Sequence, residues 1–102
     1  MITSKYFNLG KVVVTQGING AMQENERFAL EVDLCLNRYI VKDWGCLSEE
    51  DKQVNENALQ YPDDLYLLAA YNTCKGKIYI ITHRISENAG DNSTTVLFPD
   101  ER

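Results

Sequence analysis

The amino-acid sequence predicts a single α+β domain over residues 1–102, with an antiparallel sheet of three to four strands covered on one face by two to three helices. Residues 26–42 place apolar side chains at steps of three and four, the periodicity of an amphipathic helix. Residues 65–71, 77–83 and 94–98 are rich in β-branched and aromatic residues and are joined by short connections. A chain of 102 residues that is 44% hydrophobic and 25% charged suits one small folded domain.

The first element expected along the chain is a strand over residues 11–16. This segment reads Lys-Val-Val-Val-Thr-Gln and lies between two glycines, which favours a strand over a helix. Residues 17–20 read Gly-Ile-Asn-Gly and predict a turn. Asn19 is expected to cap a short helical turn over residues 21–23, because its side chain can accept hydrogen bonds from helix amides.

The helix over residues 26–42 is expected to be the main amphipathic helix. The residues on its apolar face are Phe28, Val32, Cys35, Leu36, Tyr39 and Ile40. Asn25 precedes the helix and is a candidate N-cap. The helix should end by Gly45, because a residue without a side chain adopts the left-handed conformation of a helix end at little cost.

A third helix is predicted over residues 48–60, with Ser48 as its N-cap. Its first turn is acidic, and negative charge there interacts favourably with the helix dipole. A narrow buried stripe is expected, formed by Val54, Ala58 and Leu59. Pro62 prevents the helix from continuing.

The segments 65–71, 77–83 and 94–98 are expected to form an antiparallel meander, because consecutive strands with short connections usually pair with each other. The first two of these segments are nearly apolar throughout, so both are predicted to lie in the middle of the sheet. The strand over residues 11–16 is expected at an edge, beside one strand of the meander.

Charge and composition exclude several classes of protein. Ten Lys and Arg against fifteen Asp and Glu give a net charge of −5, which argues against direct binding of nucleic acid through a basic face. No apolar run approaches the ~20 residues of a membrane span. The first residues lack the apolar stretch of a signal peptide, so a cytoplasmic protein is expected.

The sequence indicates neither a cofactor nor an enzyme. Cys35, Cys46 and Cys74 are odd in number and widely spaced, which is typical of reduced thiols rather than of a disulfide framework or a zinc site. Catalysis by Cys46 or by the single histidine, His83, would need a nucleophile and a base that converge in space. The sequence places no such pair together.

The main charge feature lies at residues 49–64, where six carboxylates and one lysine give the net charge of the whole chain. These carboxylates are Glu49, Glu50, Asp51, Glu56, Asp63 and Asp64. Three interpretations stay open: a capped and soluble helix, a phosphate-like surface that binds a basic partner protein, or a metal site that lacks the calcium-loop pattern. Trp44, which precedes the segment, and Tyr61, which lies within it, are candidate anchors of a partner surface.

Four segments carry a resemblance to small accessory proteins encoded on plasmids, integrative elements and prophages of Gram-positive bacteria. They read Asp-Trp-Gly at 43–45, Ser-Glu-Glu-Asp at 48–51, Lys-Ile-Tyr-Ile-Ile-Thr at 77–82 and Thr-Thr-Val-Leu-Phe-Pro-Asp at 94–100. The likeness covers almost the whole chain. It departs from the family's pattern at His83, where the family tends to have an acidic residue.

The resemblance implies a cellular setting, because small cytosolic proteins of mobile DNA often counter host defence. In size and charge the chain is similar to the anti-CRISPR proteins, small acidic inhibitors of CRISPR effector nucleases. The expected function is therefore non-enzymatic inhibition of a host defence nuclease or its guide complex, through the six carboxylates, Trp44 and Tyr61. The alternative is a homodimeric accessory or regulatory module of plasmid or phage maintenance, which pairs through a strand edge or a tyrosine-rich face.

Overall fold

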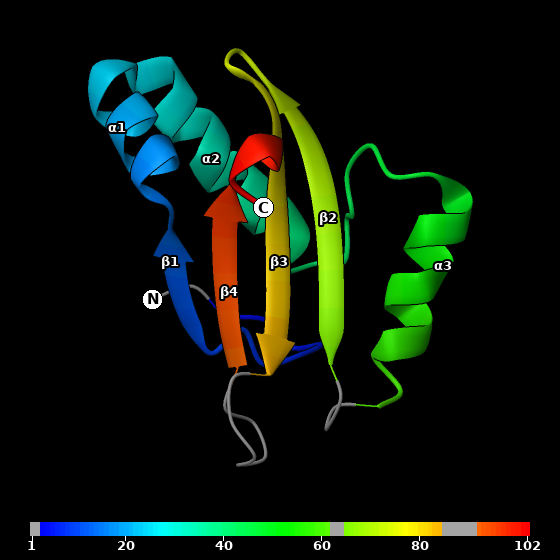
Figure 1. Ribbon diagram of the computed structural model, residues 1–102. Coiled ribbons are helices and arrows are strands. Elements are labelled where there is room, and N and C mark those ends of the chain that lie inside the picture. Colours follow the sequence, from blue (N-terminus) through cyan, green and yellow to red (C-terminus); the bar gives the residue numbers. More distant parts are fainter. Residues whose placement is uncertain (1–2, 62–64, 85–91) are drawn as a thin grey trace.

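A computed structural model of the protein describes residues 3–61, 65–84 and 92–102, and Figure 1 shows the order of its elements. The strands are β1 (Lys11–Val14), β2 (Tyr66–Thr73), β3 (Gly76–Arg84) and β4 (Asn92–Leu97). The helices are α1 (Gln16–Glu24), α2 (Glu26–Tyr39) and α3 (Glu49–Ala58), followed near the C-terminus by a short 3-10 helix, Pro99–Glu101. The predicted α+β class is confirmed.

The four strands form one sheet in the order β1-β4-β3-β2. Strands β2, β3 and β4 pair antiparallel, with Ala69 opposite Ile80 and Ile80 opposite Val96, so the predicted meander is confirmed. Strand β1 lies at an edge, as expected, and pairs in parallel with β4. The sheet is therefore mixed, with one parallel pair.

Strand β2 is an outer strand, so the prediction that residues 65–71 lie in the middle of the sheet is wrong. Strand β2 can be apolar without lying in the middle of the sheet, because other parts of the chain cover its outer edge. Cys46 donates its backbone N–H to the Ala70 carbonyl oxygen at 2.8 Å, and Ala70 donates to the Trp44 carbonyl oxygen at 3.3 Å. A Cβ atom at Gly45 would collide with that Ala70 oxygen, which explains why glycine, at a φ of 78°, stands there.

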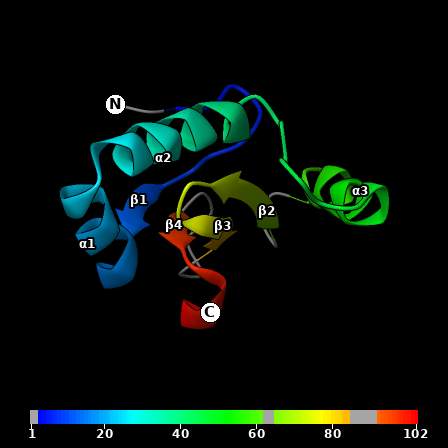
Figure 2. The same ribbon diagram turned by 90° about the horizontal axis from the view of Figure 1, so that it is seen from above.

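The helices occupy two different positions around the sheet (Figure 2). Helix α2 covers one face of the sheet. Its buried side chains, Phe28, Val32, Cys35 and Tyr39, belong to the same hydrophobic core as the buried side chains of the strands. Helix α1 packs beside α2. Helix α3 lies beyond β2, at the edge of the sheet, so no long helix of the described residues covers the face opposite α2.

Side-chain caps mark the N-terminal ends of the helices. The Asn25 side chain accepts the Phe28 N–H at 3.1 Å, and the Ser48 hydroxyl accepts the Asp51 N–H at 3.2 Å, so both predicted caps are confirmed. The predicted turn at 17–20 is wrong, because α1 already begins at Gln16. Its cap is Thr15, which accepts the Ile18 N–H at 3.3 Å, rather than Asn19.

A buried chain of hydroxyl groups joins α2 to the sheet. The Tyr39 hydroxyl donates to Thr82 Oγ1, the Thr82 and Thr94 hydroxyls lie 2.7 Å apart, and Thr94 donates to the Leu9 carbonyl oxygen. Because Thr94 has one hydroxyl proton and gives it to Leu9, Thr82 is the donor to Thr94. Burial raises the pKa of Tyr39 well above its usual range, so this chain stays neutral.

Candidate protein-binding surface

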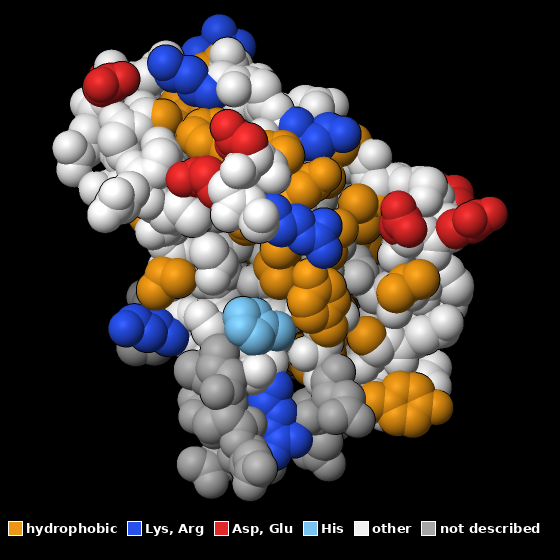
Figure 3. Space-filling view, in the orientation of Figure 1, with side chains coloured by type: hydrophobic (Ala, Val, Ile, Leu, Met, Phe, Trp, Pro, Cys, Tyr) orange, Lys and Arg blue, Asp and Glu red, His pale blue; other side chains and the backbone are white. Residues whose placement is uncertain are grey.

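The first turn of α3 displays three carboxylates to solvent. Glu49, Glu50 and Asp51 are all exposed, and the Ser48 cap fixes the turn that carries them. Figure 3 shows red carboxylates over α3, to one side of an apolar stripe that runs along the sheet face left open by α2. Their charge also lies at the positive end of the helix dipole, which stabilises this turn.

The other predicted carboxylates do not extend this surface among the described residues. Glu56 is partly buried and its Oε2 lies 3.5 Å from Lys42 Nζ, so a cation of the same chain offsets its charge. Glu49 Oε1 lies 3.5 Å from Lys52 Nζ. Asp63 and Asp64 lie outside the described residues. The acidic surface that can be described therefore centres on Glu50 and Asp51.

The two predicted aromatic anchors have opposite environments. Trp44 is 3% exposed, and its ring packs edge-on against Tyr39 at 5.6 Å and near Phe7 at 6.2 Å. A side chain buried in this way offers no surface to a partner, so Trp44 is a core residue of the segment between α2 and α3. Tyr61, by contrast, is 65% exposed and stays available as an anchor.

The buried residue of α3 is Asn55, not Val54. Asn55 donates from Nδ2 to the Leu68 carbonyl oxygen at 2.7 Å and accepts the Leu68 N–H at 3.1 Å, so its amide pairs with the outer edge of β2 as another strand would. Val54 is 61% exposed, and the predicted buried position for it is wrong. The helix meets backbone polar groups at this edge, and these need an amide rather than an aliphatic side chain.

A hollow of about 300 Å³ lies between α3 and the open face of the sheet. It is lined by Leu47, Asp51, Val54, Asn55, Tyr66, Leu68 and Arg102. Arg102 donates to the Tyr66 hydroxyl at 3.1 Å and lies 5.8 Å from the centre of the Tyr79 ring. The hollow therefore joins an apolar floor to a carboxylate and a guanidinium, a combination that suits contact with a protein side chain.

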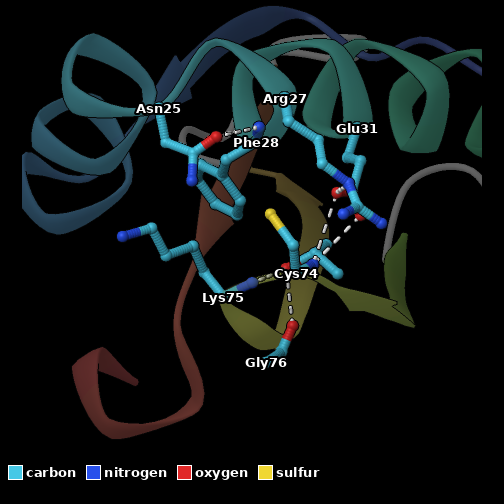
Figure 4. Close-up of polar contacts among 8 residues, drawn as sticks. Asn25, Arg27, Phe28, Glu31, Cys74, Lys75 and Gly76 are labelled. Carbon is cyan, nitrogen blue, oxygen red and sulfur yellow. Dashed lines mark hydrogen bonds and ion pairs between the residues drawn. The ribbon is translucent and has the colours of Figure 1, made fainter.

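The surroundings of Cys35 and Cys74 disfavour the reactive thiolate form. Burial raises the pKa of Cys35 to about 11, so this thiol is protonated at neutral pH. Glu31 accepts the backbone N–H of Cys74 at 3.1 Å and pairs with Arg27 at 3.2 Å (Figure 4). The Glu31 carboxylate also raises the pKa of the exposed Cys74 thiol.

Within the described ranges, no three His, Cys, Asp or Glu side chains lie close enough together to hold a metal ion.

Sequence reasoning did not identify the contribution of Asn55 or Arg102. Asn55 could have been noticed because asparagine has a weak helix propensity and occupies a position of α3 where the helix needs an inward-facing side chain. Arg102 left no recognisable signal, because only the fold brings the C-terminus over β2 and β3.

None of the helices in the described part of the chain is both long and apolar enough to span a membrane. Comparison with protein-family models, with curated proteins and with solved structures finds no match to this chain. The surface around α3 is therefore interpreted from its own chemistry.

Proposed function

We propose that this chain is a non-enzymatic, cytoplasmic protein of a mobile genetic element that binds and inhibits a host defence nuclease of the CRISPR effector type. One observation carries the proposal. The first turn of α3 presents carboxylates to solvent on a helix whose one fully buried side chain among its ten residues is Asn55. The resemblance to small mobile-element proteins supplies the cellular setting.

The chemistry of such a partner matches this surface. An effector nuclease holds its guide and target strands in a positively charged channel. Glu50 and Asp51 can take the place of phosphate groups at Lys and Arg of that channel, and opposite potentials raise the association rate. Val54 on α3 and Tyr61 just after the helix are both exposed, and they can supply apolar contact in addition to the charges.

A DNA-cleavage assay with a purified CRISPR effector nuclease, with and without its guide RNA, tests the proposal. The unmodified chain should reduce cleavage, and the double variant Glu50→Lys, Asp51→Lys should need at least ~10-fold more protein for the same inhibition. The Ser48 cap bonds the backbone of Asp51, so both substitutions leave it in place.

The matched control is Glu24→Lys, Asp100→Lys, which makes the same change in net charge at exposed positions away from α3. This control should inhibit as well as the unmodified chain. If both double variants lose inhibition equally, net charge and not the α3 surface is responsible. If neither loses it, the site assignment is wrong.

The second candidate function is a homodimeric accessory module of plasmid or phage maintenance. A specific observation favours it, because Leu30 and Leu34 on α2, and Val41 just after the helix, are about 60% exposed. This function requires self-association and no binding to a nuclease. An effector-binding assay that is negative at every concentration, together with a stable dimer, would favour it over inhibition.

A further inference from the structure

The hollow between α3 and the open face of the sheet combines apolar surface with two opposite charges. Val54 of α3 and Tyr66 and Leu68 of β2 supply apolar surface, and Asp51 and Arg102 line the same hollow. Val54 is 61% exposed and Tyr66 is 46% exposed, so much of this surface is in contact with water. A mostly apolar lining with a few polar groups is typical of sites that bind small molecules.

The size of the hollow limits what it can hold. Its volume is about 300 Å³, at the lower end of the roughly 300–1,000 Å³ of small-molecule sites. A nucleotide or a peptide of several residues is too large to be enclosed there. The volume therefore favours a ligand of about the size of one amino acid.

The Asp51 carboxylate is exposed at the hollow and can accept hydrogen bonds from a ligand. The Ser48 hydroxyl bonds the backbone N–H of Asp51 and not its side chain. Among the residues that the structure describes, no hydrogen bond or ion pair engages the Asp51 carboxylate. An ammonium group can therefore pair with it without displacing any of these residues.

Arg102 is positioned at the hollow by two tyrosines. Its Nη2 donates to the Tyr66 hydroxyl at 3.1 Å, and its guanidinium carbon lies 5.8 Å from the centre of the Tyr79 ring. A guanidinium has five N–H groups, so others remain that can bond a carboxylate. Within the described chain Arg102 and Asp51 form no ion pair with each other, so the hollow keeps the two charges separate.

We infer that this hollow binds a free α-amino acid with an apolar side chain, such as leucine. The α-ammonium group pairs with Asp51, the α-carboxylate pairs with Arg102, and the side chain lies on the apolar surface of Val54 and Leu68. Charge complementarity selects this ligand, because a purely cationic ligand would meet Arg102 and a purely anionic one would meet Asp51. The inference involves no nuclease, so its test is separate from that of the proposed function.

NMR titration of the full ¹⁵N-labelled chain with L-leucine tests the inference. The hollow is open to water, so the expected Kd is on the order of 1 mM, and the titration runs from about 0.1 to about 20 mM. The amide signals of Asp51, Asn55, Leu68 and Arg102, which line the hollow, should shift together and saturate. Glycine has both charges but no apolar side chain and should bind several-fold more weakly.

Two leucine derivatives test the two charged contacts. N-acetyl-leucine lacks the ammonium group and leucinamide lacks the carboxylate, so each should bind at least ~5-fold more weakly than leucine. Asp51→Asn should weaken leucine binding at least ~5-fold and change N-acetyl-leucine binding little. Arg102→Gln should weaken leucine binding by a similar factor and change leucinamide binding little.

The matched controls are Asp100→Asn and Arg27→Gln, which neutralise exposed residues that do not line the hollow. Both should bind leucine as the unmodified chain does, and the spectrum of each variant shows whether it is folded. Absence of saturating shifts up to the highest leucine concentration overturns the inference, as do shifts confined to residues away from the hollow. Equal affinities for leucine and its two derivatives, or equal effects of the site and control variants, overturn it as well.

Discussion

Helices α2 and α3 contact the same sheet in different ways. Helix α2 buries an aromatic and aliphatic side against the strands, and Phe28, Val32 and Tyr39 are each at most 1% exposed. Helix α3 buries one polar side chain, Asn55, against a strand edge and keeps most of its other side chains in contact with water. Helix α2 contributes to the core, and helix α3 covers an edge of the sheet.

The two helices therefore contribute differently to the stability of the fold and to the chemistry of the surface. A helix that supplies core side chains can change few residues without loss of folding, because buried volume is closely packed. A helix that is held by a cap, an amide pair and a few partly buried residues can vary its outer side widely. The outer side of α3 is therefore the part of the molecule where acidic and apolar residues can be placed for a partner.

The largest effect on stability is expected for Phe28→Ala in α2. The Phe28 ring is fully buried and stacks on Phe98 with ring centres 5.8 Å apart, so its removal should leave a cavity and cost about 3–5 kcal/mol. Urea unfolding measures this loss. Val54→Ala in α3 is the control and should cost less than about 0.5 kcal/mol. Equal losses would contradict the division between the two helices.

Asn55→Ala should have the largest effect within α3. It removes both hydrogen bonds to Leu68 and leaves a partly buried N–H and C=O on β2 without these partners, at a cost of about 1–3 kcal/mol. Hydrogen exchange of the Leu68 amide should also become faster. Asn57→Ala, on the exposed side of the same helix, should cost much less. If the two alanine variants are equally stable, the amide pair does not hold α3 to the sheet.

A smaller loss of stability is expected for Glu50→Lys and Asp51→Lys. Each replaces a negative charge by a positive one at the N-terminus of α3 and should cost roughly 0.3–1 kcal/mol, less in high salt. Thermal unfolding at two salt concentrations measures the effect. A loss as large as that of Phe28→Ala would show that this turn is part of the fold rather than a surface free for binding.

The smallest effect is a pH dependence at the end of α2. Asp43 accepts two hydrogen bonds from Arg38, and this contact lowers the pKa of Asp43 below its ordinary value of 3.8. The stabilisation is therefore complete above 3.8 and disappears as the pH falls through the lowered pKa. Both side chains are about half exposed, so solvent screening keeps it under about 0.5 kcal/mol.

Asp43→Asn tests this pH dependence by unfolding at neutral and acidic pH. The variant should be slightly less stable than the unmodified chain at neutral pH and should converge with it at low pH. A gap between the two proteins that does not narrow in acid would mean that the ion pair does not contribute.

The sequence predicts those parts of the fold that local patterns determine. Helix α2 follows from its periodicity and from Asn25, and the meander follows from three β-rich segments with short connections. The position of β2 could not be predicted, because a strand buried by its neighbours in the sheet and one buried by a covering helix have the same apolar composition. The cover itself depends on Asn55 and Gly45, whose roles appear only when distant segments meet.

Less of the candidate site than of the fold could be predicted from the sequence. An acidic first turn after Ser48 was predictable from capping alone, and the structure places Glu49, Glu50 and Asp51 there in solvent. The pairing of Glu56 with Lys42 depends on how α3 folds back on the end of α2, and spacing does not encode it. Trp44 has both an apolar ring and a polar N–H, so composition alone could not separate a core position from a surface one.

The most direct test of the central claim, that the outer side of α3 binds a basic partner and is dispensable for folding, is the salt dependence of the Kd for a purified CRISPR effector nuclease. Binding of the unmodified chain and of the Glu24→Lys, Asp100→Lys control should weaken steeply and equally as salt rises. The folded Glu50→Lys, Asp51→Lys variant should bind at least ~10-fold more weakly with a flatter dependence. Equal affinities and equal salt dependence for all three proteins would contradict the claim.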